Sequence, residues 1–304
     1  MNFSVTDETS KLKSVIIGIA KDLGPIPNIE DLYDPISIYN LKNGTYPIEN
    51  DMVIELNNFS NTLKKNGVNV FRPENIKDCN QIFVRDVGFV IDNFFFKSNI
   101  LPKRTNEFEG IKKILKKFDK EIVIMPEDVH VEGGDVIADS KNVFLGYYNE
   151  KNYSSLYTAR TNRNAVDFFK NFFPKKNIIP LHLKKSNLNV NKNILHLDCC
   201  FQLVGKKYAI LYPDGFSKKE DLKFLKSLFG AQNIFLINNK EMSKMNNNIL
   251  SIDSKTIISQ PSFKRLNNWL KSKGFLVELV SLNEVSKQGG LFRCSSLPLI
   301  RNSL

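Results

Sequence analysis

Apolar residues in this chain recur in pairs of short runs that are separated by polar turns. Each pair is typical of a β-hairpin, because both runs are rich in β-branched and aromatic residues. The four pairs cover residues 89–91 and 94–96, 136–138 and 143–145, 201–204 and 208–211, and 249–252 and 256–258. The pattern therefore predicts four hairpins, with turns such as Asp92-Asn93 and Gly205-Lys206 between the arms.

Helical periodicity separates the predicted hairpins. Apolar residues spaced three and four apart predict amphipathic helices over residues 53–66, 107–119, 160–172, 218–229 and 262–274. Apolar strands are expected where helices end, at residues 67–70 and 274–277. Repeated units of hairpin, helix and strand fit a radial α/β array better than an open doubly wound sheet. Two stretches, 26–50 and 182–193, are richer in proline, asparagine and glycine and are expected to be loops.

The composition, together with the lack of a linker segment, predicts that residues 1–304 form a single folded domain. The chain is 42% apolar and 25% charged, which is ordinary for a globular protein. Its apolar runs are far shorter than the roughly 20 residues that a membrane-spanning helix needs. The N-terminus lacks the basic and apolar segments of a secretory signal. We therefore expect a cytoplasmic protein with no membrane partner.

The net charge of +11 raises the question of nucleic-acid binding. Lysines are scattered through the whole chain, however, and only eight of the 43 basic residues are arginine. Most of the arginines lie in or beside the polar sequence motifs that are described below. Because arginine offers a planar pair of donors, this placement indicates bidentate recognition of carboxylates. Nucleic acid is therefore not expected as a partner. Six arginines lie in or beside those motifs: Arg85, Arg104, Arg160, Arg163, Arg293 and Arg301.

The strongest chemical candidate is Cys294 in the segment Gly-Gly-Leu-Phe-Arg-Cys-Ser-Ser, residues 289–296. A cysteine attacks as its thiolate, and a neighbouring guanidinium favours that form. Arg293 directly precedes the cysteine, and the glycine pair allows a tight turn. We therefore interpret Cys294 as a catalytic nucleophile that is assisted by Arg293.

Four upstream segments supply polar groups that such a cysteine would need. They are Phe-Val-Arg-Asp at 83–86, His-Val-Glu-Gly-Gly-Asp at 130–135, Ala-Arg-Thr-Asn-Arg at 159–163 and Leu-His-Leu-Asp at 195–198. Asp86, Glu132, His196 and Cys294 each precede or end a predicted strand. In a radial array these positions would meet in one pocket.

These motifs and their order resemble the guanidino-group-modifying superfamily, which includes arginine deiminase, dimethylarginine dimethylaminohydrolase and the amidinotransferases. The matching pieces are Phe-x-Arg-Asp, Glu-Gly-Gly-Asp, His-Leu-Asp and Gly-Gly-x-x-Arg-Cys-Ser-x-x-Pro-x-x-Arg ending at Arg301. The segment 11–18 also looks like the first strand of that family. The resemblance implies a five-bladed α/β propeller (pentein) of pseudo-fivefold ββαβ units, which agrees with the repeat.

The chemistry of a guanidinium suggests a role for each motif residue. Asp86 and Asp198 are suited to clamp the planar cation through paired hydrogen bonds while Cys294 attacks its central carbon. His196 is the candidate proton donor to the departing amine and then the base for the second nucleophile. Glu132 would orient His196 and favour its charged form.

The family resemblance further implies that Arg104 and Arg160 grip the α-carboxylate of an amino-acid substrate. Three other residues have interpretations that remain open. Asp135 could hold its loop, Arg85 could pair with Glu132 or another acid without touching substrate, and Arg293 departs from the histidine that deiminases commonly have there.

The expected reaction is cysteine-dependent hydrolysis of free L-arginine or a close guanidino analogue, with no metal and no organic cofactor. An amidinotransferase that passes the amidino group to an amine such as glycine is the alternative. A non-catalytic, RNA-binding propeller is a third reading, which the intact set of cysteine, histidine and carboxylates disfavours. Substrate methylation and oligomeric state, a homodimer included, stay open.

Overall fold

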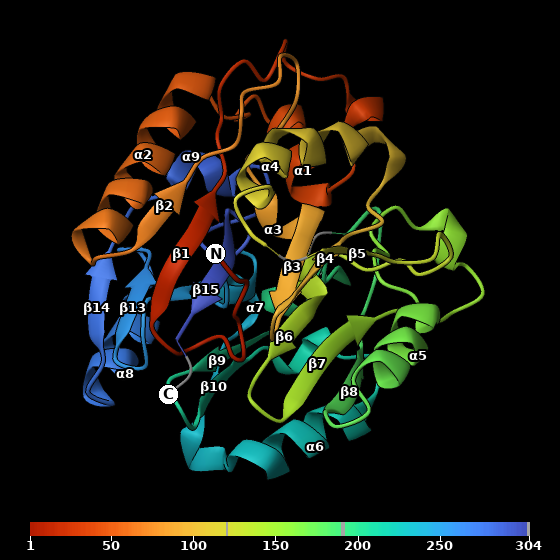
Figure 1. Ribbon diagram of the computed structural model, residues 1–304, viewed down its shortest axis with the longest axis vertical. Coiled ribbons are helices and arrows are strands. Elements are labelled where there is room, and N and C mark those ends of the chain that lie inside the picture. The colour runs from red at the N-terminus through yellow and green to blue at the C-terminus, as the bar shows by residue number, and fades with distance from the viewer. Residues whose placement is uncertain (120, 190–191, 303–304) are drawn as a thin grey trace.

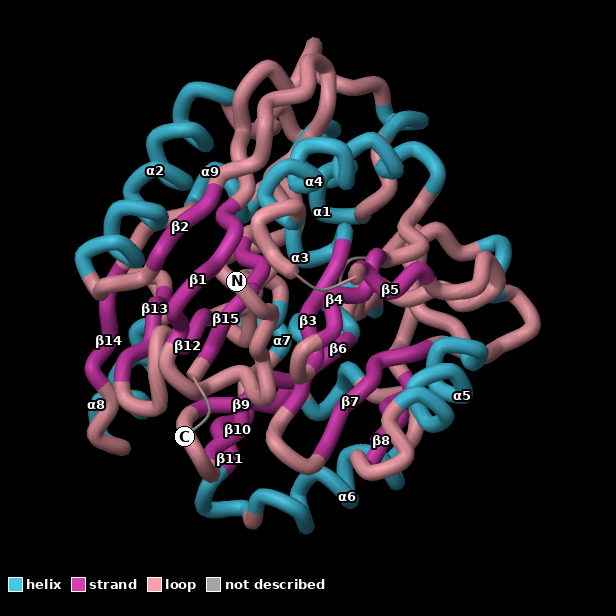
Figure 2. Tube along the Cα trace, in the orientation of Figure 1, coloured by secondary structure: helices cyan, strands magenta, loops and turns pink. Residues whose placement is uncertain are grey.

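The computed structural model describes residues 1–119, 121–189 and 192–302 and shows a mixed α/β protein built on five small sheets. Each sheet has three strands, of which the middle one pairs antiparallel with its first neighbour and parallel with the other. A helix precedes the parallel strand in each case. The four hairpins that the sequence pattern predicts lie in four of these sheets, and the five sheets fit the five units that the family resemblance implies (Figures 1 and 2).

Four of the five units are continuous in sequence. Their elements are β3 (Gly88–Ile91), β4 (Phe94–Lys97), α4 (Glu109–Leu115) and β5 (Ile122–Ile124); β6 (Val136–Ala138), β7 (Asn142–Tyr147), α5 (Arg163–Phe172) and β8 (Asn177–His182); β9 (Phe201–Val204), β10 (Tyr208–Leu211), α6 (Lys219–Phe229) and β11 (Ile234–Leu236); and β12 (Leu250–Ser251), β13 (Thr256–Ser259), α8 (Lys264–Ser272) and β14 (Leu276–Leu279).

The fifth unit joins the two ends of the chain. It contains β1 (Leu12–Ile17), α2 (Glu49–Lys65), β2 (Asn69–Phe71) and β15 (Ser296–Arg301). Strand β15 pairs antiparallel with β1, with Ile17 opposite Ser296. The strand that follows Cys294 is thereby fixed in a sheet whose other strands come from the N-terminal quarter of the chain.

The predicted hairpins are confirmed, and their turns have the conformations that the residues favour. Asp92 has φ 53° between β3 and β4, and Gly205 has φ 54° between β9 and β10. Aspartate and glycine tolerate this left-handed region better than most residues. The pairing of Ile91 with Phe94 leaves a two-residue turn at Asp92-Asn93, as predicted.

Aromatic packing joins neighbouring units. The ring of Phe96 in β4 lies 5.2 Å from the rings of Phe169 and Phe172, which belong to α5 of the next unit. Figure 1 places α2, α5, α6 and α8 at the periphery of the molecule, with the strands between them. None of the helices within the described ranges has both the length and the hydropathy to cross a membrane.

The remaining elements are short and lie mostly in the connections. The α-helices are α1 (Pro35–Lys42), α3 (Val84–Val87), α7 (Asn239–Met242) and α9 (Asn283–Ser286); the 3₁₀ helices are η1 (Ile29–Asp31), η2 (Pro102–Phe108), η3 (Gly133–Asp135), η4 (Tyr153–Ser155), η6 (Leu197–Cys199), η7 (Pro213–Gly215) and η8 (Ala231–Asn233).

The expectation of a loop over residues 26–50 is wrong in part, because this stretch contains η1, α1 and the start of α2. Asp34 caps α1 by accepting hydrogen bonds from the backbone N–H groups of Ile36 and Ser37, and Pro35 occupies the first turn. Aspartate followed by proline is a helix-start signal that the proline-rich composition concealed. In the other expected loop, residues 184–189 are irregular, and residues 190–191 lie outside the described part.

Candidate active site

All five units contribute a polar residue to one place, just before their first strands. Asp86 precedes β3, Glu132 precedes β6, His196 precedes β9, Asn248 precedes β12 and Cys294 precedes β15. The repeating topology therefore brings together side chains that are up to 208 residues apart in sequence.

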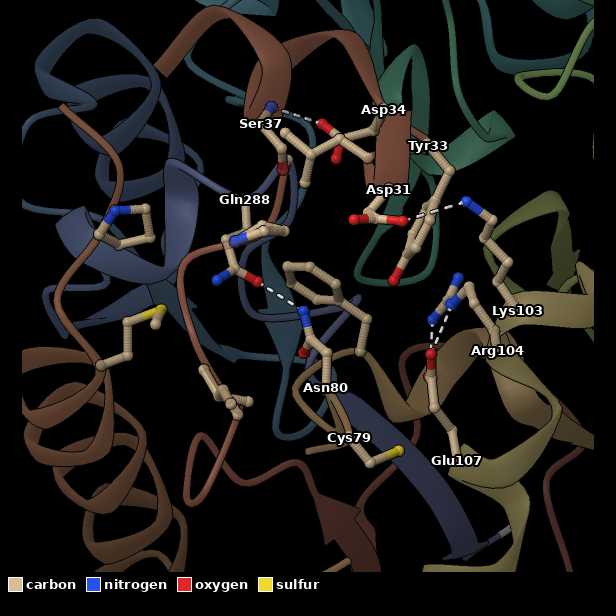
Figure 3. A pocket seen from close by; sticks show the side chains of 18 of the residues that line it. Asp31, Tyr33, Asp34, Ser37, Cys79, Asn80, Lys103, Arg104, Glu107 and Gln288 are labelled. Carbon is tan, nitrogen blue, oxygen red and sulfur yellow. Dashed lines mark hydrogen bonds and ion pairs between the residues drawn. The ribbon is translucent and has the colours of Figure 1, made fainter. Parts of the chain in front are cut away.

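A cavity of about 550 Å³ opens above this set. Asp86, Arg104, Arg160, His196 and Cys294 all line it, so five of the predicted site residues face one space. Its outer wall comes from the connections around α1 and η2, and Figure 3 shows part of this wall.

The turn that carries Cys294 is held by close backbone packing. Gly289 has φ +86°, a conformation that favours glycine. A Cβ atom at Gly290 would clash with the ring of Phe83 and would lie 2.9 Å from the Cβ of Cys294. The backbone N–H of Arg85 donates to the Cys294 carbonyl at 3.1 Å. Gly289 is therefore required by its backbone conformation, and Gly290 by the close approach of the Phe83 ring to the nucleophile turn.

The thiol of Cys294 is buried, with 4% of the residue exposed. Asn248 donates through Nδ2 to Sγ at 3.0 Å, and Asp198 Oδ2 lies 3.8 Å from Sγ. Burial and the carboxylates of Asp198 and Asp86 raise the pKa of Cys294 well above its usual value. The thiol is therefore protonated at neutral pH when the cavity holds no cation.

The expectation that Arg293 favours the thiolate is wrong. The Arg293 guanidinium is fully buried and donates to Asp198 Oδ2 at 2.9 Å, Glu8 Oε1 at 2.9 Å and the Val136 carbonyl at 2.6 Å. Adjacent residues in a tight turn point in different directions, so sequence proximity did not bring this charge to the sulfur. Arg293 instead compensates the carboxylate of Asp198.

His196 and Glu132 form a buried pair beside the cavity. The imidazole Nε2 lies 2.7 Å from Glu132 Oε2, and Nδ1 lies 3.8 Å from Asp86 Oδ1. Burial alone would lower the pKa of His196, but the carboxylates of Asp86 and Glu132 outweigh it and raise the pKa. A Cβ atom at Gly134 would lie 2.6 Å from Cγ of the imidazole, so the glycine makes room for the ring.

The two arginines assigned to carboxylate binding are both buried and already bound by the protein. Arg104 forms a bidentate pair with Glu107 at 2.7 and 2.8 Å and donates to Asp86 at 2.8 Å. Arg160 donates through Nη1 to both oxygens of Glu132 at 3.0 Å. These pairs offset part of the negative charge of Asp86 and Glu132, and Asp86 Oδ1 keeps no hydrogen-bond partner among the described residues. The predicted roles of Arg104 and Arg160 in binding substrate stay predictions.

Tyr33 lies between these two arginines. Its ring centroid is 5.4 Å from the Arg104 guanidinium and 5.6 Å from that of Arg160. Arg160 also donates through Nη2 to the Tyr33 carbonyl at 3.0 Å. Figure 3 shows Tyr33 beside Arg104 and Glu107 at the wall of the cavity. No sequence pattern pointed to this residue, because Tyr33 lies in a segment that was expected to be a loop.

Asp135 and Arg85 lie outside the cavity. Asp135 accepts hydrogen bonds from Thr161 Oγ1 at 2.6 Å and from the Leu197 backbone N–H at 2.8 Å, which ties its turn to the turn after His196. Arg85 faces Glu8 at 3.8 Å instead of Glu132. Asp198 is likewise not exposed at the cavity, although it lies directly beside the Cys294 sulfur.

Among the described residues, one group of side chains has spacing compatible with a metal ion. Oxygen and nitrogen atoms of Asp86, Glu132 and His196 lie within 4.8 Å of one another. Arg104 and Arg160 already supply positive charge to the two carboxylates. The arrangement therefore supports acid–base chemistry by His196 without a cation in this position.

Sequence reasoning missed Asn248, although the repeat held a signal for it. The residue stands just before the first strand of its unit, at the place that Asp86, Glu132, His196 and Cys294 occupy in theirs. Its Oδ1 accepts from the backbone N–H groups of Arg293 and Cys294 at 3.0 and 3.2 Å. One amide thus fixes the nucleophile turn and donates to the sulfur.

Replacing Asn248 with aspartate is expected to lower kcat/KM by about 100-fold, because a hydrogen bond to a charged group contributes roughly 1.5–3 kcal/mol. The carboxylate keeps the acceptor for the two N–H groups but loses the donor and adds negative charge beside the sulfur. The pKa of Cys294 should rise further, so the pH at which iodoacetamide modifies it should move upward. An unchanged pH profile would show that Asn248 does not stabilise the thiolate.

Comparison with known proteins agrees with this geometry. The model of the family described as "N,N dimethylarginine dimethylhydrolase, eukaryotic" matches residues 40–301. The uncharacterized protein YkgA of Bacillus subtilis (strain 168) is 31% identical over 222 residues, which are 73% of this chain and 70% of that protein. The uncharacterized protein ZK1307.1 of Caenorhabditis elegans is 26% identical over 248 residues, or 80% of this chain and 82% of that protein.

Two solved structures share the fold at 17% identity. The N-terminal domain of ArgZ, an arginine dihydrolase from the ornithine–ammonia cycle in cyanobacteria, superposes with a TM-score of 0.79 and covers 96% of this chain and 98% of its own. SxtG, an amidinotransferase from Microseira wollei, gives a TM-score of 0.76 and covers 99% and 98%. The chain therefore belongs to the N,N-dimethylarginine dimethylhydrolase family, within the guanidino-group-modifying superfamily that its motifs resemble.

Proposed function

We propose that this protein hydrolyses the guanidino group of free L-arginine or a close analogue, methylated arginines included, and releases citrulline and an amine. The observation that supports this most directly is the convergence of Cys294, His196 and Asp86 on one cavity, with Asp198 beside the sulfur. A thiol flanked by two carboxylates is suited to a cationic, planar substrate.

The five sheets likewise support the proposal that the fold is an α/β propeller with five blades.

The first step follows from the raised pKa of the thiol. Two carboxylates oppose thiolate formation in the free protein, and a guanidinium held by Asp86 and Asp198 would neutralise them. Substrate binding would thus lower the pKa of Cys294, and the thiol proton would be lost to solvent. The thiolate then bonds to the guanidinium carbon and gives a tetrahedral adduct.

His196 would move the remaining protons. Its raised pKa keeps it charged, so it can protonate the departing amine nitrogen as the C–N bond breaks and leaves a covalent S-alkylthiouronium. The neutral imidazole then takes a proton from the water that attacks the thiouronium carbon. Breakage of the C–S bond returns the thiol and releases the ureido product. Glu132 holds the imidazole in both steps.

A product analysis tests this function and its alternative together. The protein is incubated with arginine, methylated arginines and agmatine, with and without glycine, and the products are identified by mass spectrometry. Citrulline formed at the same rate with or without glycine supports the hydrolase. A glycine-dependent product that carries the amidino group would assign an amidinotransferase, and salt-sensitive RNA binding without any turnover would favour the non-catalytic reading.

The proposed carboxylate-binding role of Arg160 leads to a substrate-selective prediction. Its Nη2 is bonded to a neutral backbone carbonyl, that of Tyr33, which a substrate carboxylate can replace. Replacing Arg160 with lysine should raise KM for arginine by about tenfold and spare agmatine, which has no carboxylate. Steady-state kinetics with both substrates measure this difference. Equal losses would show that Arg160 acts only by holding Glu132.

A further inference from the structure

A buried cluster of charges lies behind the nucleophile, on the side away from the cavity. We call it the axial ion cluster, and it consists of Glu8, Arg85, Asp198, Arg293 and Arg301. All five residues are at most 5% exposed. Arg293 is the central member, because Nη1 donates to Asp198 and Nη2 donates to Glu8, each at 2.9 Å. The chain of contacts from Glu8 through Arg293 to Asp198 ends at the Cys294 sulfur, 3.8 Å from Asp198.

Hydrogen bonds hold the N-terminal segment at Glu8 itself and in the turn that follows it. The Glu8 backbone N–H donates to the carbonyl of Ala138, the last residue of β6, at 3.1 Å. Asp7 caps the following turn by accepting hydrogen bonds from the backbone N–H groups of Thr9 and Ser10. Burial alone would raise the pKa of Glu8, but Arg293 and Arg85 outweigh it and lower the pKa to about 2. Glu8 is therefore a fixed negative charge at neutral pH.

The cluster carries an excess of positive charge, which the loss of Glu8 would increase. Three guanidinium groups face two carboxylates, and one of those carboxylates is Asp198. Nη2 of Arg85 and the Nε atoms of Arg293 and Arg301 have no hydrogen-bond partner among the described residues. Burial and the nearby Arg293 lower the pKa of Arg85 to about 9, which reflects the excess of positive charge. Glu8 and Asp198 thus share the compensation of Arg293.

Arg293 competes with a substrate cation for the carboxylate of Asp198. Asp198 Oδ2 is taken by Arg293, whereas the contact of Oδ1 with the Cys199 sulfur, at 3.7 Å, is weak. An attraction for a substrate cation remains only if Arg293 is partly neutralised from elsewhere. Glu8 provides that neutralisation through the second nitrogen of the same guanidinium.

We propose that Glu8 is a positioning residue of the active site, which holds Arg293 so that Asp198 remains available to bind a cationic group beside Cys294. The proposal rests on the proposed function in taking a guanidinium or amidinium as the ligand. It assigns a positioning role in the active site to the N-terminal segment, which lies outside residues 40–301, the range that the family model matches.

The test compares two alkylating reagents on Cys294 and needs no turnover. Iodoacetamide is neutral, and 2-chloroacetamidine carries a planar cation that the two carboxylates can hold. Second-order rate constants are measured at neutral pH by intact mass, with peptide mapping to separate Cys294 from the other cysteines. In the parent protein the cationic reagent should be favoured once each rate constant is divided by that reagent's rate constant with free cysteine, because this ratio cancels the difference between the chloride and iodide leaving groups. A parent that prefers neither reagent would contradict the clamp itself, and with it the proposed function.

Replacing Glu8 with glutamine should move the two rates in opposite directions. Without the negative charge of Glu8, the Arg293 guanidinium is neutralised only by Asp198, so Asp198 attracts a second cation less strongly. The cationic reagent should therefore react about tenfold more slowly. The same loss makes the surroundings of the thiol more positive, so iodoacetamide should react about twofold faster. A loosened fold would change both rates in the same direction, and that result, or two unchanged rates, would overturn the proposal.

Asp7 provides a control for the turn, because it caps the residues after Glu8 and has no hydrogen bond to Arg293 in the described structure, although its charge acts on Arg301. Asp7→Asn should therefore change the ratio of the two rates much less than Glu8→Gln does, and an equal change in the two variants would assign the effect to the turn. If Glu8→Gln does not fold, Glu8→Asp takes its place. It keeps the charge and shortens the reach to Arg293, so the cationic reagent should slow about threefold at an unchanged iodoacetamide rate. A ratio equal to that of the parent in this variant would contradict the positioning role.

Discussion

Replacing Cys294 with serine is expected to lower kcat by about 10⁴-fold or more while leaving the fold intact. A hydroxyl does not form an alkoxide near neutral pH, even when a bound cation offsets the charges of Asp86 and Asp198. Serine is similar in size and can still accept the hydrogen bond from Asn248. The measurement is the initial rate of citrulline formation, together with a thermal unfolding curve for each protein.

Cys79 offers a matched control for this substitution. It lines the same cavity, as Figure 3 shows, and burial raises its pKa to about 11. Cys79→Ser should therefore retain activity, since that sulfur has no carboxylate clamp beside it. Comparable turnover by the parent and by Cys294→Ser would exclude the covalent mechanism.

Replacing His196 with alanine is expected to trap the covalent intermediate when the leaving group needs no proton. An S-alkylthiocitrulline loses a thiol, so Cys294 should still attack and be alkylated without help from an imidazole. Hydrolysis of the thiouronium would then stall, because no base activates water. Intact-mass measurement should show the protein heavier by the retained amidino-amino-acid group, with Cys294 as the modified residue.

The structure indicates that this variant should fold. Glu132 keeps both hydrogen bonds to Arg160 when the imidazole is removed, so its buried carboxylate stays paired. His130 is the control: it is half-buried, contacts Tyr153 Oη at 3.0 Å and does not line the cavity that contains Cys294. His130→Ala should turn over normally. Rapid and complete turnover by His196→Ala, without a trapped adduct, would show that His196 is not the general base.

Several elements could be predicted from the sequence because they depend on local pattern. The alternation of apolar runs and turns predicted the β3–β4 and β9–β10 hairpins, since register and turn chemistry are short-range properties. The helix expected over residues 160–172 begins later, at Arg163, because Asn162 caps it by accepting from the Ala165 backbone N–H. The loop expected over 26–50 contains α1 for a similar reason, since a capping aspartate and a proline start a helix within a polar stretch.

The motifs by themselves determined the superfamily and the residues that meet at Cys294. Asp86, Glu132 and His196 each stand before the first strand of a repeating unit, so equivalent positions in the sequence become neighbours in space. Asn248 also stands before the first strand of its unit, and the hairpin of that unit was predicted. The residue itself was not predicted, because an asparagine in an asparagine-rich chain does not indicate a catalytic role.

Only the tertiary structure decided where the buried charges are directed. Arg293 adjoins Cys294 in sequence, yet its guanidinium turns away to Asp198 and Glu8, the latter 285 residues distant. Arg160 faces Glu132 and the Tyr33 carbonyl, and the thiol has a raised pKa instead of a lowered one. The physical reason is that a buried charge is stable only beside an opposite charge. The packing of all five units decides which opposite charge each buried side chain contacts, so the local sequence pattern does not predict the partner.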